Sequence, residues 1–336
     1  MSDKILLGHG SGGKMSRDLI DNYIVKAFGN PTLNKLADAA ALNLPTGQVA
    51  MTTDSFVVTP PVFPGGDIGK LAIYGTLNDL AMMGAKPLYL SVGLILEEGL
   101  EMDLFKRIID SMALAADKAG VRIVTGDTKV VEKGKGDQIF INTTGIGVIP
   151  MGINLEPTNV EVGDKIILSG TIGDHGMTIM SCRKGLNLKT DLESDCASLA
   201  ELAAKMLEVE PNIRVMRDPT RGGVASTINE LAEQAGVEIR IDEKEVPILP
   251  QVEGICDLLG LDPFHVANEG KLMAIVPSDN AQQVLEAMKE LPVGEDAAII
   301  GEVVSRSEYP EVFIKTEIGT TRILEMLTGN QLPRIC

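Results

Sequence analysis

The chain repeats one pattern on both sides of a short interruption: β-rich apolar runs alternate with segments that have helical periodicity. Alternating strands and helices favour an α/β fold, so each side is predicted to form an α/β domain. The interruption, residues 150–164, contains two prolines and two glycines and has little periodicity, which is typical of a linker. The 336 residues also exceed what one core usually spans. We therefore predict an N-terminal domain at 1–152, a C-terminal domain at 153–327 and a mobile tail at 328–336.

The periodicity also predicts where the elements of each domain lie. In the N-terminal domain, helices are expected at 15–28, 68–84 and 102–119, and strands at 48–58, 88–96, 121–125 and 139–149. In the C-terminal domain, helices are expected at 175–184, 197–208, 223–236 and 280–291, and strands at 165–169, 237–241, 272–276, 298–304 and 312–315. The order of the strands within either sheet stays open.

A formal net charge of −17 makes binding to DNA, RNA or anionic membranes unfavourable, and no cluster of Lys and Arg opposes that sign locally. Aromatic residues are only 3% of the chain, so base-stacking surfaces are not expected. A phosphate-bearing ligand would have to be small and accompanied by divalent cations. No apolar run approaches the roughly 20 residues that cross a bilayer, and the N-terminus lacks a signal-peptide pattern, so we expect a cytoplasmic protein.

The four cysteines form no CxxC pair, which argues against a zinc site, an iron–sulfur cluster or a disulfide framework. Cys182, Cys196 and Cys256 are expected to be core or structural thiols. Cys336 ends the chain, and a thiol on a Gly- and Pro-containing arm can travel between a partner and an active site. On composition alone, an incidental exposed cysteine is nearly as good an interpretation.

The opening segment 8–14, GHGSGGK, fits two nucleotide-binding patterns. It satisfies GxGxxG, and it matches a P-loop except that Met15 stands where Ser or Thr binds magnesium. Both patterns require a preceding strand within a βαβ unit, and only 4–7 is available, so neither is favoured. A flexible loop whose backbone amides fold over phosphates is the preferred interpretation, with Gly10 and Gly12 as candidates. Of the three histidines, only His9, in this loop, has a plausible functional setting.

Five aspartates form a series along the chain, and several of them stand beside small residues at predicted strand or helix ends: Asp38, Asp54, Asp79, Asp127 and Asp218. Carboxylates at such points can hold Mg²⁺, which takes oxygen ligands and shares them with nucleotide phosphates. For any single aspartate, a helix cap or a turn residue is at least as good an interpretation. Their convergence in space is a hypothesis that one sequence does not test.

Two more polar residues stand next to predicted strands. Lys129, in the predicted loop 126–130, is placed to neutralise a phosphoryl group, and a solvated surface lysine is an equal alternative. Glu269 precedes the strand predicted at 272–276, where it is placed either to act on a substrate or to end a loop.

In order along the chain, these motifs resemble those of the PurM-like ATP-binding superfamily and, within it, the HypE family of hydrogenase maturation factors, the carbamoyl dehydratases. The resemblance covers essentially the whole chain, and the PRIC ending is specific to this branch. One departure is that Asp38 lacks the second Asp that relatives often carry in its loop. The matching motifs are 9–13 (HGSGG), 38–40 (DAA), 53–55 (TDS), 78–84 (NDLAMMG), 126–130 (GDTKV), 217–223 (RDPTRGG), 268–270 (NEG) and 333–336 (PRIC).

The resemblance implies a two-domain α/β fold in which the N-terminal domain pairs with a second copy through its sheet, forming a homodimer. It implies ATP and Mg²⁺ in a carboxylate-rich cleft that the second domain closes. It also implies protein partners: the carbamoyltransferase HypF, which loads the cysteine, and the HypC and HypD pair, which receives cyanide on iron. The implied activity is ATP-dependent dehydration of a carbamoyl group on Cys336 to the cyano group that becomes a ligand of the hydrogenase iron.

The resemblance further implies roles for single residues. Asp54, Asp79 and Asp218 would hold Mg²⁺, with Asp38 and Asp127 assisting. Asn78 would orient the substrate. Further nucleotide contacts are implied at Gly10, Gly12, Thr128 and Arg221.

For the chemistry on Cys336, Glu269 is the first candidate for the proton acceptor. Lys129 is the candidate for stabilising the transferring phosphoryl group, and His9 stays open for either acid/base role.

Two other classes of function fit parts of the sequence. A selenophosphate synthetase or thiamine phosphate kinase would share the aspartate motifs, but neither needs a terminal cysteine. A non-enzymatic assembly scaffold would use Cys336 to tether iron or a partner.

Overall fold

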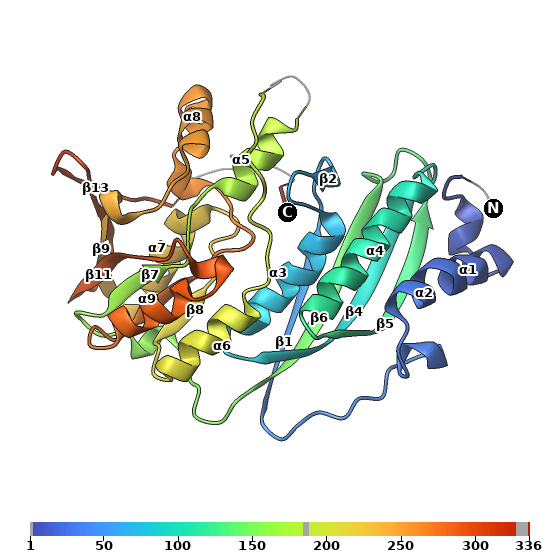
Figure 1. The fold of residues 1–336 in the computed structure, drawn as a ribbon, viewed down its shortest axis with the longest axis horizontal. Helices are drawn as coiled ribbons and strands as arrows, with labels where there is room; N and C mark the ends of the chain where they lie inside the picture. Colours follow the sequence, from blue (N-terminus) through green and yellow to red (C-terminus); the bar gives the residue numbers. More distant parts are fainter. Residues whose placement is uncertain (1–2, 184–187, 327–334) are drawn as a thin grey trace.

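The computed structural model describes residues 3–183, 188–326 and 335–336. The two larger sheets, one in each half of the molecule, lie side by side along its long axis (Figure 1). The C-terminus lies between the two halves, and the N-terminus lies at the far end of the first (Figure 1). Within the described ranges, no helix is long and apolar enough to cross a membrane.

The N-terminal half is built on a four-stranded sheet with the order β1-β6-β4-β5. β6 pairs antiparallel with both β1 and β4, whereas β4 and β5 run parallel. The strands are β1 (Gln48–Phe56), β4 (Lys86–Glu97), β5 (Arg122–Val131) and β6 (Ile139–Ile149). The long helices α3 (Ile68–Met82) and α4 (Met102–Lys118) contact each other, and their apolar residues share one core with the buried side of this sheet.

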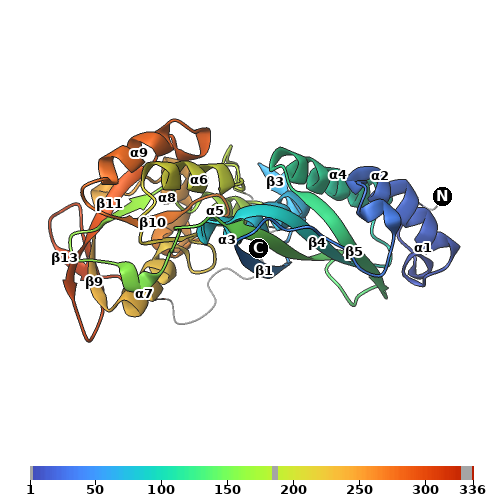
Figure 2. The same cartoon turned by 90° about the horizontal axis from the view of Figure 1, so that it is seen from below.

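The opposite face of this sheet is open (Figure 2). Side chains alternate along β1, so that residues 50, 52, 54 and 56 are turned toward the helices and their neighbours are exposed. Apolar side chains lie on the exposed side: Val49, Met51 (70% exposed) and Ile95. No element of the described chain covers these residues.

Helix α3 begins and ends at residues suited to these positions. The Asp67 carboxylate accepts hydrogen bonds from the backbone N–H groups of Gly69 and Lys70 at 2.9 and 3.0 Å, which caps the first turn. Gly84 follows the last turn with a φ of 69°, a left-handed conformation that favours glycine. The helix is buried nearly all round because it lies between its own sheet and α6 (Ala200–Val209) of the second half. Its last turns therefore lie at the boundary between the two halves.

The prediction of a loop at 126–130 is wrong, because β5 continues through these residues to Val131. β4 pairs with β5 along the whole stretch. A Cβ at Gly126 would lie 2.3 Å from the carbonyl oxygen of Val92, so the glycine allows this close pairing. The motif thus contributes strand residues: Asp127, Thr128 and Lys129.

The C-terminal half is built on a seven-stranded sheet with the order β13-β12-β9-β11-β7-β10-β8. Among its described pairs, β9 and β12 run parallel and the others antiparallel. Neighbouring residues of β7 enter different apolar cores, so both faces are covered: α7 packs on one face, and α6 and α9 on the other. The elements are β7 (Lys165–Leu168), β8 (Val215–Arg217), α7 (Gly223–Ala235), β9 (Val237–Asp242), β10 (Met273–Val276), α9 (Ala281–Lys289), β11 (Ala298–Arg306), β12 (Val312–Lys315) and β13 (Thr321–Ile323).

The other predicted elements are present with their ends shifted by a few residues. The helix expected at 15–28 consists of α1 (Lys14–Leu19), a π-helical turn and α2 (Val25–Phe28), and the one expected at 175–184 is α5 (Asp174–Ser181). Five α-helices and strands of the described residues were not predicted: α8 (Pro250–Leu259), β2 (Val62–Phe63), β3 (Gly66–Asp67), β8 and β13. β8 and β13 are too short to show a periodicity. The segment 150–164 contains one short 3₁₀ turn, Pro157–Asn159.

The mobile tail predicted at 328–336 lies mostly outside the described residues. Ile335 and Cys336 are described, and both pack in an apolar cluster that joins the N-terminal half to α5 and α8 of the C-terminal half. All four cysteines are free, and Cys196 and Cys256 are buried, as predicted for core thiols.

Candidate active site

Three of the predicted aspartates lie together where the two halves face each other. Asp54 lies on β1, Asp79 near the end of α3, and Asp218 directly after β8. The Thr52 hydroxyl donates to Asp79 Oδ2 at 2.7 Å, and the Thr76 hydroxyl lies 3.4 Å from Asp54 Oδ2. We call Asp54, Asp79 and Asp218 the aspartate cluster.

Burial and mutual repulsion raise the pKa values of two carboxyls in this cluster. Burial, and then the charges of Asp218 and Asp54, raise the pKa of Asp79 to about 7. Burial, with the Asp54 charge as a smaller contribution, raises the pKa of Asp218 to about 6. Asp79 is therefore partly protonated near neutral pH, and a cation bound at the cluster would displace this proton.

The cluster fits a magnesium ion only if other ligands help. Among the described residues, no group of three or more His, Cys, Asp or Glu side chains is arranged to hold one metal ion. Mg²⁺ does not need such a cage, since it keeps several waters and binds through one or two carboxylates together with substrate phosphates. Carboxylates close enough to raise the pKa of one another are a donor set suited to that mode of binding.

The terminal cysteine lies against Glu269, beside the aspartate cluster. The Cys336 thiol and the Glu269 carboxyl lie close enough to shift the pKa of each other. Glu269 is only 4% exposed, and its Oε1 atom has no hydrogen-bond partner within the described residues. Burial, and then the charges of Asp195 and the nearby cluster, raise the pKa of Glu269. Burial, and then the charge of Glu269, raise the pKa of the Cys336 thiol, and the exposed Arg221 opposes this effect.

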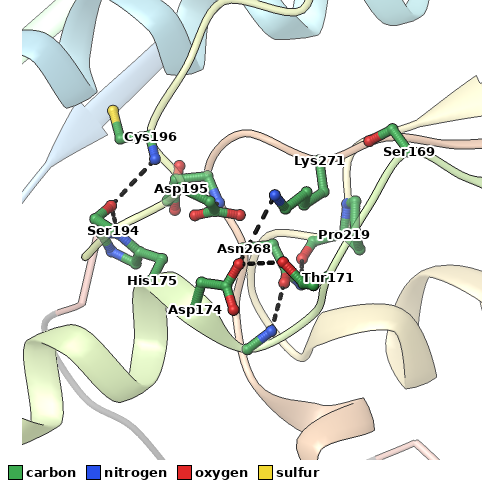
Figure 3. A network of polar contacts seen from close by, with 12 residues as sticks. Ser169, Thr171, Asp174, His175, Ser194, Asp195, Cys196, Pro219, Asn268 and Lys271 are labelled. Atoms are coloured by element: carbon green, nitrogen blue, oxygen red, sulfur yellow. Dashed lines mark hydrogen bonds and ion pairs between the residues drawn. The ribbon is translucent and has the colours of Figure 1, made fainter. Parts of the chain in front are cut away.

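Asn268, which precedes Glu269 in the chain, connects neighbouring loops through its side chain, and Figure 3 shows it among its partners. Its side-chain Nδ2 donates to the carbonyl oxygen of Pro219 at 2.8 Å, and its Oδ1 accepts from the Gly173 N–H at 2.7 Å. The Glu269 backbone N–H in turn donates to Asp195 Oδ1 at 3.1 Å. The aspartate at 218 and the glutamate at 269 are therefore held by one network of hydrogen bonds.

Asn78 joins the two halves of the molecule. Its Oδ1 accepts from the Leu199 N–H at 2.8 Å, and its Nδ2 donates to the carbonyl oxygen of Ala197 at 3.0 Å. A weaker bond, 3.5 Å long, reaches the carbonyl oxygen of Glu269. The side chain is 1% exposed and its amide is engaged by the backbone of the second half, so it acts on the position of the Glu269 loop.

Gly270 is required by the close approach of two backbones in this network. A Cβ at Gly270 would lie 1.8 Å from the carbonyl oxygen of Asp195. We expect Gly270→Ala to lower the free energy of unfolding by roughly 1–3 kcal/mol, because one of the two segments must move. Chemical denaturation measures this change. Gly254→Ala is the matched control, since a Cβ there meets nothing within 4 Å; an equal loss in both variants would contradict the argument.

A second group of predicted site residues lies beside β5, away from the aspartate cluster. His9, Gly10 and Gly12 line a cavity of about 250 Å³ with the middle of β5: Asp127, Thr128 and Lys129. His9 is buried, and its Nδ1 accepts from the Leu6 N–H at 2.9 Å.

The charged residues of this second group pair with each other. Lys129 Nζ lies 2.8 Å from Asp127 Oδ2 in an exposed ion pair, and its hydrogen bond lowers the pKa of Asp127. Asp38 is exposed in a bend outside the helices and strands, and its neighbours Ala37 and Ala39 line another surface hollow with β5.

The register of the sheet explains why one chain keeps these groups apart. Asp127 pairs with Gly93, Gly93 with Asn142, and Asn142 with Ser55, so these residues form one row across the sheet. Side chains of one row point to the same face, and Ser55 is next to Asp54, which therefore points to the other face. β1 and β5 are opposite edges of the sheet, about 14 Å apart at the usual spacing between strands. Within one chain, Lys129 is not part of the aspartate cluster.

Two residues near the thiol were not expected from the sequence. Asp195 contacts the Glu269 backbone, and its Oδ2 has no hydrogen-bond partner among the described residues. His175 donates from Nε2 to the backbone oxygen of Ile335 at 2.5 Å, whereas the sequence points to His9 alone among the three histidines. Neither residue has a spacing or motif in the sequence that would have identified it.

Family models match the two halves of the chain. The model described as AIR synthase related protein, N-terminal domain, matches residues 36–149, and the C-terminal domain model of the same description matches residues 161–312. Thiamine-monophosphate kinase from Stenotrophomonas maltophilia has a TM-score of 0.66 at 20% identity, which shows a shared fold.

The chain is more similar to proteins named HypE. Carbamoyl dehydratase HypE of Cupriavidus necator is 52% identical, over 100% of this chain and 95% of that protein. The crystal structure of hydrogenase maturation protein HypE in complex with ATP has a TM-score of 0.94 at 50% identity, covering 98% of this chain and 99% of that one. In a crystal structure of a HypE–HypF complex, a chain 48% identical has a TM-score of 0.81, covering 92% of this chain and 99% of that one.

Proposed function

The chain belongs to the HypE family of carbamoyl dehydratases, and on that premise we infer that it uses ATP to dehydrate a carbamoyl group on Cys336 to a cyano group. ATP is the expected nucleotide because a relative of 50% identity was solved in complex with ATP. The role in the cell is maturation of the hydrogenase iron centre, which receives the cyano group as a ligand.

The contact between Cys336 and Glu269 is the observation that carries this proposal. A chain-terminal thiol lies against a buried carboxyl with an unused acceptor atom, beside three more carboxyls. A scaffold that only tethers a partner would not need its thiol enclosed among acidic groups. A dehydratase does, because its substrate is attached to that sulfur.

The reaction needs the amide oxygen to become a leaving group. The carbamoyl oxygen attacks the γ-phosphorus of ATP, the bond from phosphorus to ADP breaks, and the nitrogen loses one proton to leave an imidate phosphate. The C–O bond then breaks, phosphate leaves, and the nitrogen loses its second proton as the C≡N bond forms. S-carbamoyl cysteine and ATP thus give S-cyano cysteine, ADP and phosphate.

Glu269 is the residue we propose as the acceptor of these protons. Its carboxyl is buried beside the Cys336 thiol, and a raised pKa makes it a stronger base once it is ionised. Arg221 lies close enough to lower the pKa of the Cys336 thiol, and we propose that its charge also stabilises the negative charge that develops at the phosphate.

The aspartate cluster would hold Mg²⁺, with Asp79 and Asp218 as the first ligands and Asp54 beside them. When bound, the ion supplies positive charge to the phosphates during phosphoryl transfer. Asp38 and Asp127 would assist only from outside this cluster, since both are exposed.

A homodimer through the four-stranded sheet is part of the proposal. The open face of that sheet exposes Val49, Met51 and Ile95, a surface that a second copy would cover. Lys129 lies on the face of the sheet opposite to Asp54, so its proposed role in charge stabilisation, and that of His9, would require the second chain to bring these residues to the cluster. Gly10, Gly12 and Thr128 belong to the same group.

The proposed protein partners follow from the family. HypF would load the carbamoyl group, in line with the solved HypE–HypF complex of a relative. HypC and HypD would accept the cyano group. A thiamine phosphate kinase or selenophosphate synthetase activity is less well supported, because the similarity to a thiamine-monophosphate kinase amounts to the fold alone.

Mass spectrometry of the C-terminal peptide tests the proposed function. The full chain is carbamoylated with cyanate and incubated with Mg²⁺ and ATP. We expect the carbamoylated peptide to lose the mass of one water molecule, and only when ATP is present. A peptide that keeps its mass while ATP is consumed would exclude the dehydratase.

A further inference from the structure

We propose that His175 positions the end of the chain: its Nε2–H donates to the backbone carbonyl oxygen of Ile335 and thereby holds the Cys336 sulfur at Glu269. The inference rests on the proposed function, since it assigns a positioning residue to that reaction. Nε2 lies 2.5 Å from the oxygen, and the imidazole, on α5, is fully buried.

The surroundings of the ring leave it one tautomer and one orientation. A carbonyl oxygen only accepts hydrogen bonds, so Nε2 carries the proton and Nδ1 is an acceptor. Nδ1 lies 2.8 Å from Ser194 Oγ, whose hydroxyl donates to it while its oxygen accepts from the Cys196 N–H at 3.2 Å (Figure 3). Burial lowers the pKa of His175, which keeps the ring neutral. Phe63 packs against the ring at 87°, with 5.6 Å between the centroids.

The helix that carries the ring is tied to the segment that carries the glutamate. The Gly173 N–H donates to Asn268 Oδ1 at 2.7 Å, and the Gly176 N–H donates to the carbonyl oxygen of Ala267 at 3.1 Å. Ala267 and Asn268 directly precede Glu269 in the chain. His175, which donates to the Ile335 backbone, and Glu269, which lies beside the thiol, therefore belong to two segments that are joined by hydrogen bonds.

Two contacts on Ile335 leave the last residue little freedom. The hydrogen bond from His175 fixes its backbone, and its side chain is 5% exposed in an apolar cluster that includes residues of both halves. Cys336 follows one peptide bond later, about 3.8 Å from Cα to Cα. A backbone contact next to the reactive residue sets where the sulfur lies regardless of what is attached to it. The contact suits a site that must accept the thiol and its carbamoyl form alike.

The test compares two readouts in the full chain. The first is the rate at which iodoacetamide alkylates Cys336, read on the C-terminal peptide, and the second is cyanation of the cyanate-treated chain with ATP. We expect His175→Phe to speed alkylation and to slow cyanation, each about fivefold, the effect of one lost hydrogen bond. His175→Gln keeps an N–H donor and should restore most of both. His265→Phe is the matched control, because the His265 Nε2 donates to the carbonyl oxygen of Glu325 at 2.9 Å, away from the thiol.

The outcomes separate this inference from the proposed function. If His175→Phe does not fold, Ser194→Ala keeps the ring and removes its orienting partner, and both rates should change in the same directions. Unchanged alkylation in the folded variant, or slower cyanation without faster alkylation, would overturn the positioning role. If the cyanate-treated chain without any substitution never forms the cyano product, the proposed function fails. The alkylation rates still decide whether His175 holds the terminal peptide.

Discussion

Cys336→Ala is expected to abolish formation of the cyano product and to leave nucleotide binding unchanged. The reaction takes place on the sulfur, so no other residue replaces it, whereas the aspartate cluster that would hold the Mg²⁺–nucleotide is untouched. The measurement is twofold: ATP affinity by titration calorimetry, and cyanation by mass spectrometry of the cyanate-treated chain.

The matched control for this variant is Cys182→Ala. Cys182 is also a free and partly exposed thiol, at the end of α5, but it lies outside the aspartate cluster and the contact with Glu269. This control should keep full activity. Residual cyanation of Cys336→Ala, or equal losses in the two variants, would exclude the terminal thiol as the carrier.

Asp79→Asn is expected to lower ATP-dependent turnover by about 100- to 1,000-fold, the usual cost of removing one preorganised electrostatic contact. The reason is the loss of one Mg²⁺ ligand at the phosphates, while the thiol still accepts a carbamoyl group. Steady-state ADP release measures the loss. Asp110→Asn, at an exposed carboxylate on α4, is the control and should be neutral.

The same substitution has an expected effect on stability with a definite sign. The pKa of Asp79 is raised to about 7 in the folded chain, from 3.8 without such an environment, so the folded state binds more protons between these values. Without nucleotide and Mg²⁺, the free energy of unfolding of the chain without substitutions should therefore fall as the pH rises from about 4 to about 7. Asn does not ionise, so Asp79→Asn should be more stable at pH 8, by at most about 4 kcal/mol, and equal near pH 4. Denaturant titrations at both pH values check this.

A result in which Asp79→Asn loses stability at pH 8 would mean that the carboxyl is already paired with a positive charge. Unchanged ATP turnover would mean that the cluster is not the metal site. Either result would be independent of the role of Cys336.

The sequence by itself determined the two α/β halves, because strand and helix periodicities are local patterns that repeat on both sides of residues 150–164. It also indicated Cys336 by its place at the end of the chain, and Asp54, Asp79 and Asp218 by their motifs. Each of these patterns lies within a few neighbouring residues and can therefore be read without a fold.

Only the tertiary structure decided which of these residues lie together. The contacts that build the site join distant parts of the chain: Asn78 with Glu269, 191 residues apart, and His175 with Ile335, 160 residues apart. The pairing of β5 with β4 turned the predicted loop around Lys129 into a strand and placed Asp127 on the face opposite to Asp54. The physical reason is that the sequence of a strand shows which side chains share a face. The pairing with partner strands decides whether that face is turned toward the helices or away from them.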